Sequence, residues 1–188
     1  MRAAVVVLAD GAVQNYARRI VYALNTRWGV PFYASLLPVH ISLKQPFAFE
    51  DMAALEDYCD GMAASLRPFE VRLDRLYYTE WNGYAILGIN AVETPTLRGL
   101  HERLNRELAG LFADTRAPHD GSEYHFHLTV EMGPTGEPNR FKEYFDSLRD
   151  KALDLRFTAR ALGVFFYPQS SGQPQTFIHY RTCQLGAD

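Results

Sequence analysis

The stretch PVHISLKQPF, residues 38–47, places a histidine and a serine two positions apart within a run that predicts a β-strand. In a strand, residues i and i+2 point to the same face, so His40 and Ser42 share one face. Ile41 and Leu43 point to the other face, toward a core. A polar pair backed by an apolar pair is typical of a strand that lines a cleft.

A second stretch of the same design, HLTV at residues 127–130, follows 127 − 40 = 87 residues later. His127 and Thr129 therefore also share a strand face. Two imidazoles facing one cleft suit phosphoryl chemistry, because a side chain with a pKa of about 6.5 can take a proton from water or give one to a leaving oxygen. The neighbouring hydroxyls would donate hydrogen bonds to the non-bridging phosphate oxygens.

The elements predicted around the two motifs occur in the same order twice. Apolar spacing and turn residues predict helices over 12–28, 51–66, 95–112 and 139–152, and strands over 3–8, 38–44, 69–78, 83–91, 124–132, 154–166 and 175–185. After the first strand the order is α, β, α, β, β, and then the same again. We therefore expect a single domain over 1–188 made of two pseudo-symmetric lobes, with repeat copies at about 10–91 and 93–185.

The paired motifs, their separation and the duplicated α+β layout resemble the 2H phosphoesterase superfamily, which includes the 2′-5′ RNA ligase group and RNA 2′,3′-cyclic phosphodiesterases. The resemblance covers nearly the whole chain. It implies a bilobal fold with two antiparallel sheets around a central cleft and helices outside. It also implies metal-independent hydrolysis of a 2′,3′-cyclic phosphate or of a 2′-5′-linked nucleotide or RNA end, and it leaves open a reversible 2′-5′ RNA ligase activity.

The resemblance also implies roles for the motif residues. His40 would be the general acid toward the leaving 3′ oxygen, and His127 would be the base for water. Ser42 and Thr129 would hold the phosphate. The first motif carries serine where many relatives carry threonine, which keeps the hydroxyl.

The residues after the second motif depart from the family pattern. RNA-processing relatives often carry a basic residue there, whereas this chain has Glu131 and Met132. Strand alternation predicts that Glu131 shares the face of His127 and Thr129. A carboxylate at that place disfavours a polyanion, so RNA is less favoured as substrate than a smaller cyclic phosphate.

Five further residues are candidates for substrate binding. Lys44 would lie on the face of His40, where its side chain would either bind a phosphate or be solvated at the end of the strand. His125 would share the face of His127 and extend the site. The remaining candidates are aromatic residues that would stack on a nucleobase or pack in the core: Tyr33, Phe47 and Tyr167.

Other histidines and basic residues have simpler interpretations. His179, in the last predicted strand, is interpreted as a structural histidine. His101 is expected to face solvent in the middle of a helix. The arginines of that helix are expected to form an ordinary solvated face: Arg98, Arg103 and Arg106.

Composition limits the classes of function. The chain has 188 residues, 47% of them hydrophobic and 22% charged, and a net charge of −3, which is ordinary for a globular protein and disfavours one that coats nucleic acid. The expected partner is a small nucleotide or an RNA end, without a membrane, and we expect a monomer. The apolar run at 3–9 is too short for a membrane span or a signal peptide.

No cofactor or metal is expected. Cys59 and Cys183 lie far apart and form no metal-type spacing, which favours a reduced cytoplasmic setting and leaves one disulfide between them open. Two rival functions remain. One is a non-catalytic protein of the same fold that binds an RNA end or nucleotide. The other is a metal-dependent hydrolase with zinc on His40, His125 and His127, although no carboxylate or cysteine falls at a familiar zinc spacing.

Overall fold

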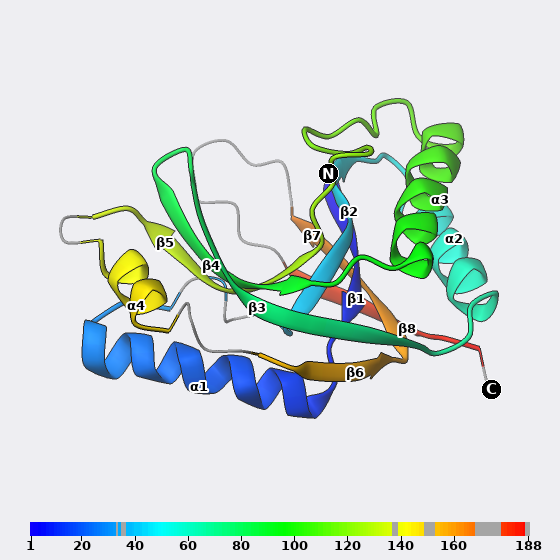
Figure 1. The fold of residues 1–188 in the computed structure, drawn as a ribbon. Coiled ribbons are helices and arrows are strands. Elements are labelled where there is room, and N and C mark those ends of the chain that lie inside the picture. Colours follow the sequence, from blue (N-terminus) through cyan, green and yellow to red (C-terminus); the bar gives the residue numbers. More distant parts are fainter. Residues whose placement is uncertain (33, 35–36, 137–138, 149–152, 168–177, 187–188) are drawn as a thin grey trace.

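The computed structural model describes residues 1–32, 34, 37–136, 139–148, 153–167 and 178–186 (Figure 1). Within these residues the chain forms four helices and eight strands. In chain order they are β1 (Arg2–Leu8), α1 (Gly11–Trp28), β2 (His40–Ala48), α2 (Met52–Ala64), β3 (Phe69–Trp81), β4 (Tyr84–Ala91), α3 (Pro95–Leu111), β5 (His127–Pro134), α4 (Arg140–Leu148), β6 (Leu155–Ala159), β7 (Ala161–Tyr167) and β8 (Ile178–Gln184).

The helices begin and end where the sequence supplies caps. Asp10 accepts a hydrogen bond from the Val13 amide at the start of α1, and Gly29 ends that helix with a φ of 65°. Thr94 caps α3, whose first residue is a proline. These signals explain why the bounds of α1 and α3 follow the prediction closely. Residues 149–152, the end of the fourth predicted helix, lie outside the described residues.

The eight strands form one sheet, in the order β6-β3-β4-β5-β2-β1-β7-β8. The expectation of two separate sheets is therefore wrong, because β2 and β5 pair at the centre and join the two halves. Each half contains strands from both of the predicted repeat copies. The strands β3 and β4 lie with β5 and β6, and the strands β7 and β8 lie with β1 and β2. The duplication itself stays a prediction, since strand order does not test it.

One predicted strand is two strands. The segment 154–166 is interrupted at Arg160, where the chain passes from one half of the sheet to the other. Before the break β6 pairs with β3, and after it β7 pairs with β1. A single strand could not make both pairings, because β3 and β1 are separated by β4, β5 and β2.

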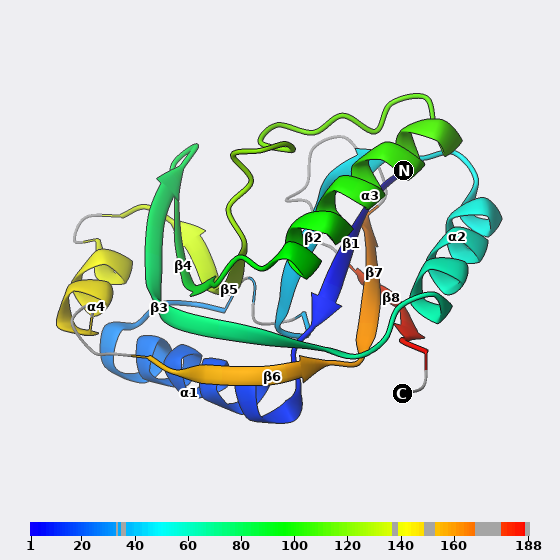
Figure 2. The ribbon, with the colours of Figure 1, turned by 45° about the vertical axis from the view of Figure 1, so that its right-hand side comes forward.

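The helices cover one face of the sheet and leave the motif residues on the other. The helices α1 and α4 contact the strands of the β5 half, and α2 and α3 contact the strands of the β2 half (Figures 1 and 2). The apolar residues of both motifs point into this core and are at most 2% exposed: Ile41, Leu43, Leu128 and Val130. The strand alternation predicted for the motifs is confirmed at these positions. None of the described helices is long and apolar enough to cross a membrane.

Candidate active site

The central register of the sheet brings the two motifs together. The second residue of one motif pairs with the second residue of the other, Ile41 with Leu128. Antiparallel pairing then extends this register by one residue on each side. Each histidine therefore lies opposite the hydroxyl residue of the other motif, on the face turned away from the helices.

The two histidines are diagonal neighbours across this pair of strands. His40 lies opposite Thr129, and Ser42 lies opposite His127. Diagonal positions on one face of an antiparallel pair are about 7–8 Å apart at Cα. Both histidines and both hydroxyl residues therefore lie on the same face of the two central strands.

Both imidazoles are held by the same contact. The Nδ1 atom of His40 lies 2.8 Å from the carbonyl oxygen of Pro38, and the Nδ1 atom of His127 lies 3.0 Å from the carbonyl oxygen of His125. A carbonyl oxygen only accepts hydrogen bonds, so this contact assigns the Nδ1 proton in each ring. The Nε2 atom of each neutral ring is then the one with a free lone pair for proton transfer.

Burial makes both rings weak bases. The rings of His40 and Phe165 pack in a T-shaped arrangement, with centroids 4.6 Å apart. Burial lowers the pKa of His40 to about 4, helped by the positive charge that His127 or His179 would carry. Burial also lowers the pKa of His127. At neutral pH the free site therefore holds two neutral imidazoles.

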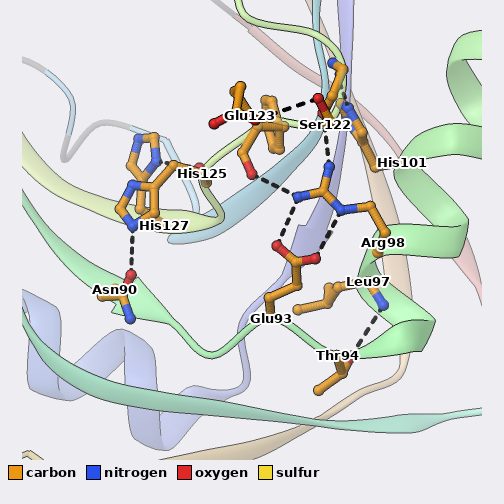
Figure 3. A network of polar contacts seen from close by, with 12 residues as sticks. Asn90, Glu93, Thr94, Leu97, Arg98, His101, Ser122, Glu123, His125 and His127 are labelled. Carbon is orange, nitrogen blue, oxygen red and sulfur yellow. Dashed lines mark hydrogen bonds and ion pairs between the residues drawn. The ribbon is translucent and has the colours of Figure 1, made fainter.

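His125 lies beside the second histidine, as the strand pattern predicted. Its ring stacks on His127 with centroids 5.6 Å apart and lies 4.8 Å from the ring of Tyr77. Its Nε2 donates to the side-chain oxygen of Asn90 at 2.5 Å (Figure 3). The Asn90 amide nitrogen donates in turn to Asp74 at 2.7 Å. These two hydrogen bonds fix the ring of His125, and burial lowers the pKa of His125.

A β-bulge turns Lys44 away from the site. Val6 pairs with Ser42, but the next residue of β1, Val5, pairs with Lys44, so one residue of β2 is extra. The side chain of Lys44 is 1% exposed and forms an ion pair with Asp120. The prediction that Lys44 shares the face of the first histidine is wrong, because the bulge interrupts the alternation.

The second motif has the same bulge at the equivalent place. Gly88 pairs with Thr129 and Leu87 pairs with Glu131, so Glu131 points into the core and is 1% exposed. One oxygen of the Glu131 carboxylate accepts hydrogen bonds from the Ala34 amide at 2.5 Å and from the Met132 amide at 3.0 Å. The prediction that this carboxylate lies on the site face is wrong. The argument against a polyanionic substrate that rested on it no longer holds.

The aromatic candidates have different outcomes. Phe47 is 0% exposed and packs against Phe49 and Phe112 in the core, so it does not face a ligand. A second register shift in β2, between the pairs Val5–Lys44 and Ala3–Phe47, returns Phe47 to the helix side. Tyr33 lies outside the described residues. Tyr167 ends β7, and its side chain lies outside the part of the chain that the structure describes.

A buried histidine supports the first motif from behind. His101 is 0% exposed rather than solvent-facing, so that expectation is wrong. Its Nδ1 donates to the carbonyl oxygen of Leu43 at 2.7 Å, and its Nε2 accepts from the Gly121 amide at 3.2 Å. Next to it, the Tyr124 hydroxyl donates to the carbonyl oxygen of Ser42 at 2.9 Å. The segment that leads into β5 is thus bound to the bulge of β2.

Arg98 fixes the same segment from α3 (Figure 3). Its guanidinium pairs with both oxygens of Glu93, at 2.9 and 2.7 Å, and donates to the carbonyl oxygens of Gly121 and Tyr124. Its side chain is 17% exposed, so it does not belong to a solvated helix face as expected. No spacing in the sequence signals the two carbonyl contacts, because they join Arg98 to residues that are 23 and 26 positions away.

Two other sequence interpretations can be compared with the structure. His179 lies on β8 with its ring 5.3 Å from Phe165, one aromatic ring away from His40. Cys59 and Cys183 are buried free thiols, so they form no disulfide. In the part of the chain that the structure describes, no group of three His, Cys, Asp or Glu side chains is placed to hold a metal ion.

Solved structures of other proteins share this fold. The protein TT0787 of Thermus thermophilus matches over 100% of both chains, with a TM-score of 0.73 and 15% identity. Escherichia coli LigT in its apo form matches over 98% of this chain and 97% of its own, with a TM-score of 0.58 and 12% identity. LigT has also been solved with ATP, NADP+ and 3′-AMP. A search of curated proteins found no match.

The family follows from a sequence comparison. The family model of the 2′-5′ RNA ligase superfamily matches residues 11–169, which include both histidine motifs. The chain therefore belongs to the 2′-5′ RNA ligase superfamily, a group of 2H phosphoesterases. This agrees with the resemblance that the two motifs carry.

Proposed function

We propose that this protein is a phosphodiesterase that opens a 2′,3′-cyclic phosphate, or cleaves a 2′-5′-linked nucleotide, by acid and base catalysis with His40 and His127. The observation that carries the proposal is the matched orientation of the two rings. Each has its Nδ1 bound to a carbonyl oxygen two residues earlier and its Nε2 left for chemistry. Ser42 and Thr129 would hold the non-bridging oxygens of the phosphate.

The reaction needs one proton taken and one proton given. The Nε2 of His127 takes a proton from water as the water oxygen bonds to phosphorus. The bond from phosphorus to the 3′ oxygen breaks, and that oxygen receives a proton from the Nε2 of His40. The product carries a 2′-phosphate, and a second proton exchange with solvent resets the pair.

The acid role of His40 depends on the bound substrate. In the free site its lowered pKa keeps the ring neutral. A phosphodiester anion beside the ring favours the imidazolium, and so does the carbonyl oxygen of Pro38. We therefore propose that His40 takes up its proton together with the substrate.

An activated substrate tests these roles separately. A 4-nitrophenyl phosphodiester needs no proton on its leaving group, since 4-nitrophenolate leaves as an anion. We expect His40→Ala to keep most of its activity on that ester and His127→Ala to lose it. The opposite result would exchange the two roles and leave the pairing intact.

The buried position of Glu131 leaves an RNA end as an acceptable substrate. LigT binds adenine nucleotides in its solved complexes, which supports a nucleotide-type ligand for this chain as well. The free thiols of Cys59 and Cys183 support a reduced, cytoplasmic setting.

The substrate class can be tested with 2′,3′-cyclic nucleotides and short RNAs that end in a cyclic phosphate, with and without a chelator. We expect product formation that survives the chelator. Binding of these ligands without turnover would instead favour the non-catalytic binding protein. Loss of turnover in the chelator would favour a metal-dependent hydrolase.

A further inference from the structure

The face of the sheet that carries the histidines continues to the tip of the β3–β4 hairpin. Three strands run side by side there, and their register gives three rows of directly paired residues. We call these nine residues the hairpin strip. From the site outward, the rows are Tyr77, Gly88 and Thr129; Thr79, Ile86 and Met132; and Trp81, Tyr84 and Pro134.

The hairpin strip is the face of these strands turned away from the core. The residues between its members point to the helices: Leu87 and Ala85 are 0% exposed, and Tyr78 stacks on Phe145 of α4 with centroids 5.7 Å apart. At the outer end Trp81 is 57% exposed and Tyr84 is 39% exposed. Two large aromatic side chains therefore lie next to each other at the far end of the face that begins with Thr129.

The strip carries aromatic rings and no charge. None of its nine side chains is ionisable near neutral pH. At the inner border of the strip, Arg75 is 67% exposed and pairs with Asn90, which in turn pairs with His127. The Asp74 carboxylate lies 3.7 Å from the Arg75 guanidinium and accepts a hydrogen bond from Asn90, so this carboxylate is already engaged.

These properties fit nucleobases. Bases stack on aromatic side chains whatever their sequence, because every base has a π-face. Close to a phosphate site, an uncharged aromatic surface without carboxylates accepts bases and does not repel the backbone. The hairpin strip is thus uncharged, whereas the whole chain has a net charge of −3.

The length of the strip sets the size of the ligand. Tyr77 and Trp81 are four residues apart on one strand, which corresponds to about 13 Å. A stacked single strand advances about 3.4 Å per nucleotide. A ligand that reaches from the histidines to the hairpin tip therefore contains several nucleotides.

We propose that the hairpin strip binds the nucleotides that precede the reacting phosphate, so that the preferred substrate is the 3′ end of a single-stranded RNA rather than a cyclic mononucleotide. The inference rests on the proposed function, because the strip is continuous with the two-histidine site. A 2′,3′-cyclic phosphate closes the 3′ end of a chain. The rest of the RNA strand extends from the cyclic phosphate in one direction only. The hairpin strip likewise extends from the histidines in one direction, toward the hairpin tip.

A length series tests the proposal. The KM is measured for a cyclic mononucleotide and for an RNA hexamer with a 2′,3′-cyclic phosphate, with the wild type and with the double variant Trp81→Ala, Tyr84→Ala. We expect the wild-type KM to fall at least tenfold from mononucleotide to hexamer. In the double variant the hexamer KM rises roughly 5- to 150-fold, the effect of losing one stacked base.

Two further variants serve as controls. Tyr22→Ala removes an aromatic side chain that is 69% exposed on α1 and leaves both KM values unchanged. Trp81→Phe keeps a ring at the tip and retains most of the length effect. Equal KM values for the two substrates in the wild type, or a hexamer KM in the double variant within twofold of the wild type, would overturn the proposal.

A binding measurement separates this proposal from the proposed function. The affinity for a fluorescent RNA hexamer ending in a 3′-phosphate is measured by anisotropy, which needs no turnover. Affinity that falls in the double variant supports the strip even if no substrate is hydrolysed. Hydrolysis of cyclic mononucleotides without any length effect would support the active site and refute the strip. Unchanged RNA affinity together with a change in self-association would assign the tip to a protein contact and also refute it.

Discussion

The lowered pKa of His40 makes a prediction about stability in acid. The unfolded chain binds a proton at this side chain near pH 6.5, whereas the folded chain does so only near pH 4. Between these values the unfolded state holds more protons, so stability falls as the pH falls. The contribution is fully present above about pH 6.5 and is lost progressively toward pH 4.

The size of the effect follows from the difference between the two states. A difference of about 2.5 pKa units corresponds to about 3 kcal/mol once the pH is below both values. At pH 5 the expected loss relative to pH 7.5 is about 2 kcal/mol. Because His40 is not completely removed from solvent, these figures are upper values.

Urea unfolding at pH 7.5, 6.0 and 5.0 measures this loss. The variant His40→Gln lacks the titrating group and should lose about 2 kcal/mol less than the wild type between pH 7.5 and 5.0. The control is His119→Asn, which removes an exposed imidazole at a backbone φ of 68° that asparagine tolerates. It should follow the wild-type curve. If His40→Gln and the wild type lose stability in parallel, the buried neutral state of this ring is refuted.

Two other substitutions test the structure around the motifs. Lys44→Ala leaves Asp120 as an unpaired charge in a buried site, so the free energy of unfolding should fall by about 3–5 kcal/mol. Arg72→Ala breaks only an exposed ion pair and should change it by at most about 1 kcal/mol; similar losses would contradict the burial of the Lys44 pair. Gly88→Ala places a Cβ 2.6 Å from a backbone oxygen of β5, so we expect a loss of about 1–3 kcal/mol and a lower kcat. Gly110→Ala, with nothing within 4 Å of its Cβ, should be neutral or stabilising; an equal effect of both would refute the close approach.

Local signals in the sequence predicted most of the elements. Caps such as Asp10 and Thr94 and the turn Asn82-Gly83, with φ values of 49° and 77°, each act through a few neighbouring residues. Periodicity therefore placed the helices and most of the strands. The break at Arg160 was missed because it depends on which distant strand each segment pairs with, and a continuous apolar pattern does not encode that.

The candidate site shows the same limit more sharply. The face of His40 and His127 could be predicted because a strand alternates over two residues. Four residues after each histidine, the prediction failed at both Lys44 and Glu131, because a bulge adds one residue and reverses the alternation. His101 was missed for another reason: its partners lie 20 and 58 residues away, and an isolated histidine in a helix carries no signal of burial.

The central claim is that two histidines share one phosphodiester. It is tested most directly by the kcat/KM for hydrolysis of a 2′,3′-cyclic nucleotide in the wild type, His40→Ala and His127→Ala, with His119→Asn as the control. We predict turnover in the wild type and the control, and a loss of about 10²–10⁴-fold in each of the two alanine variants. Wild-type rates in either His40→Ala or His127→Ala, with the fold intact, would contradict the account.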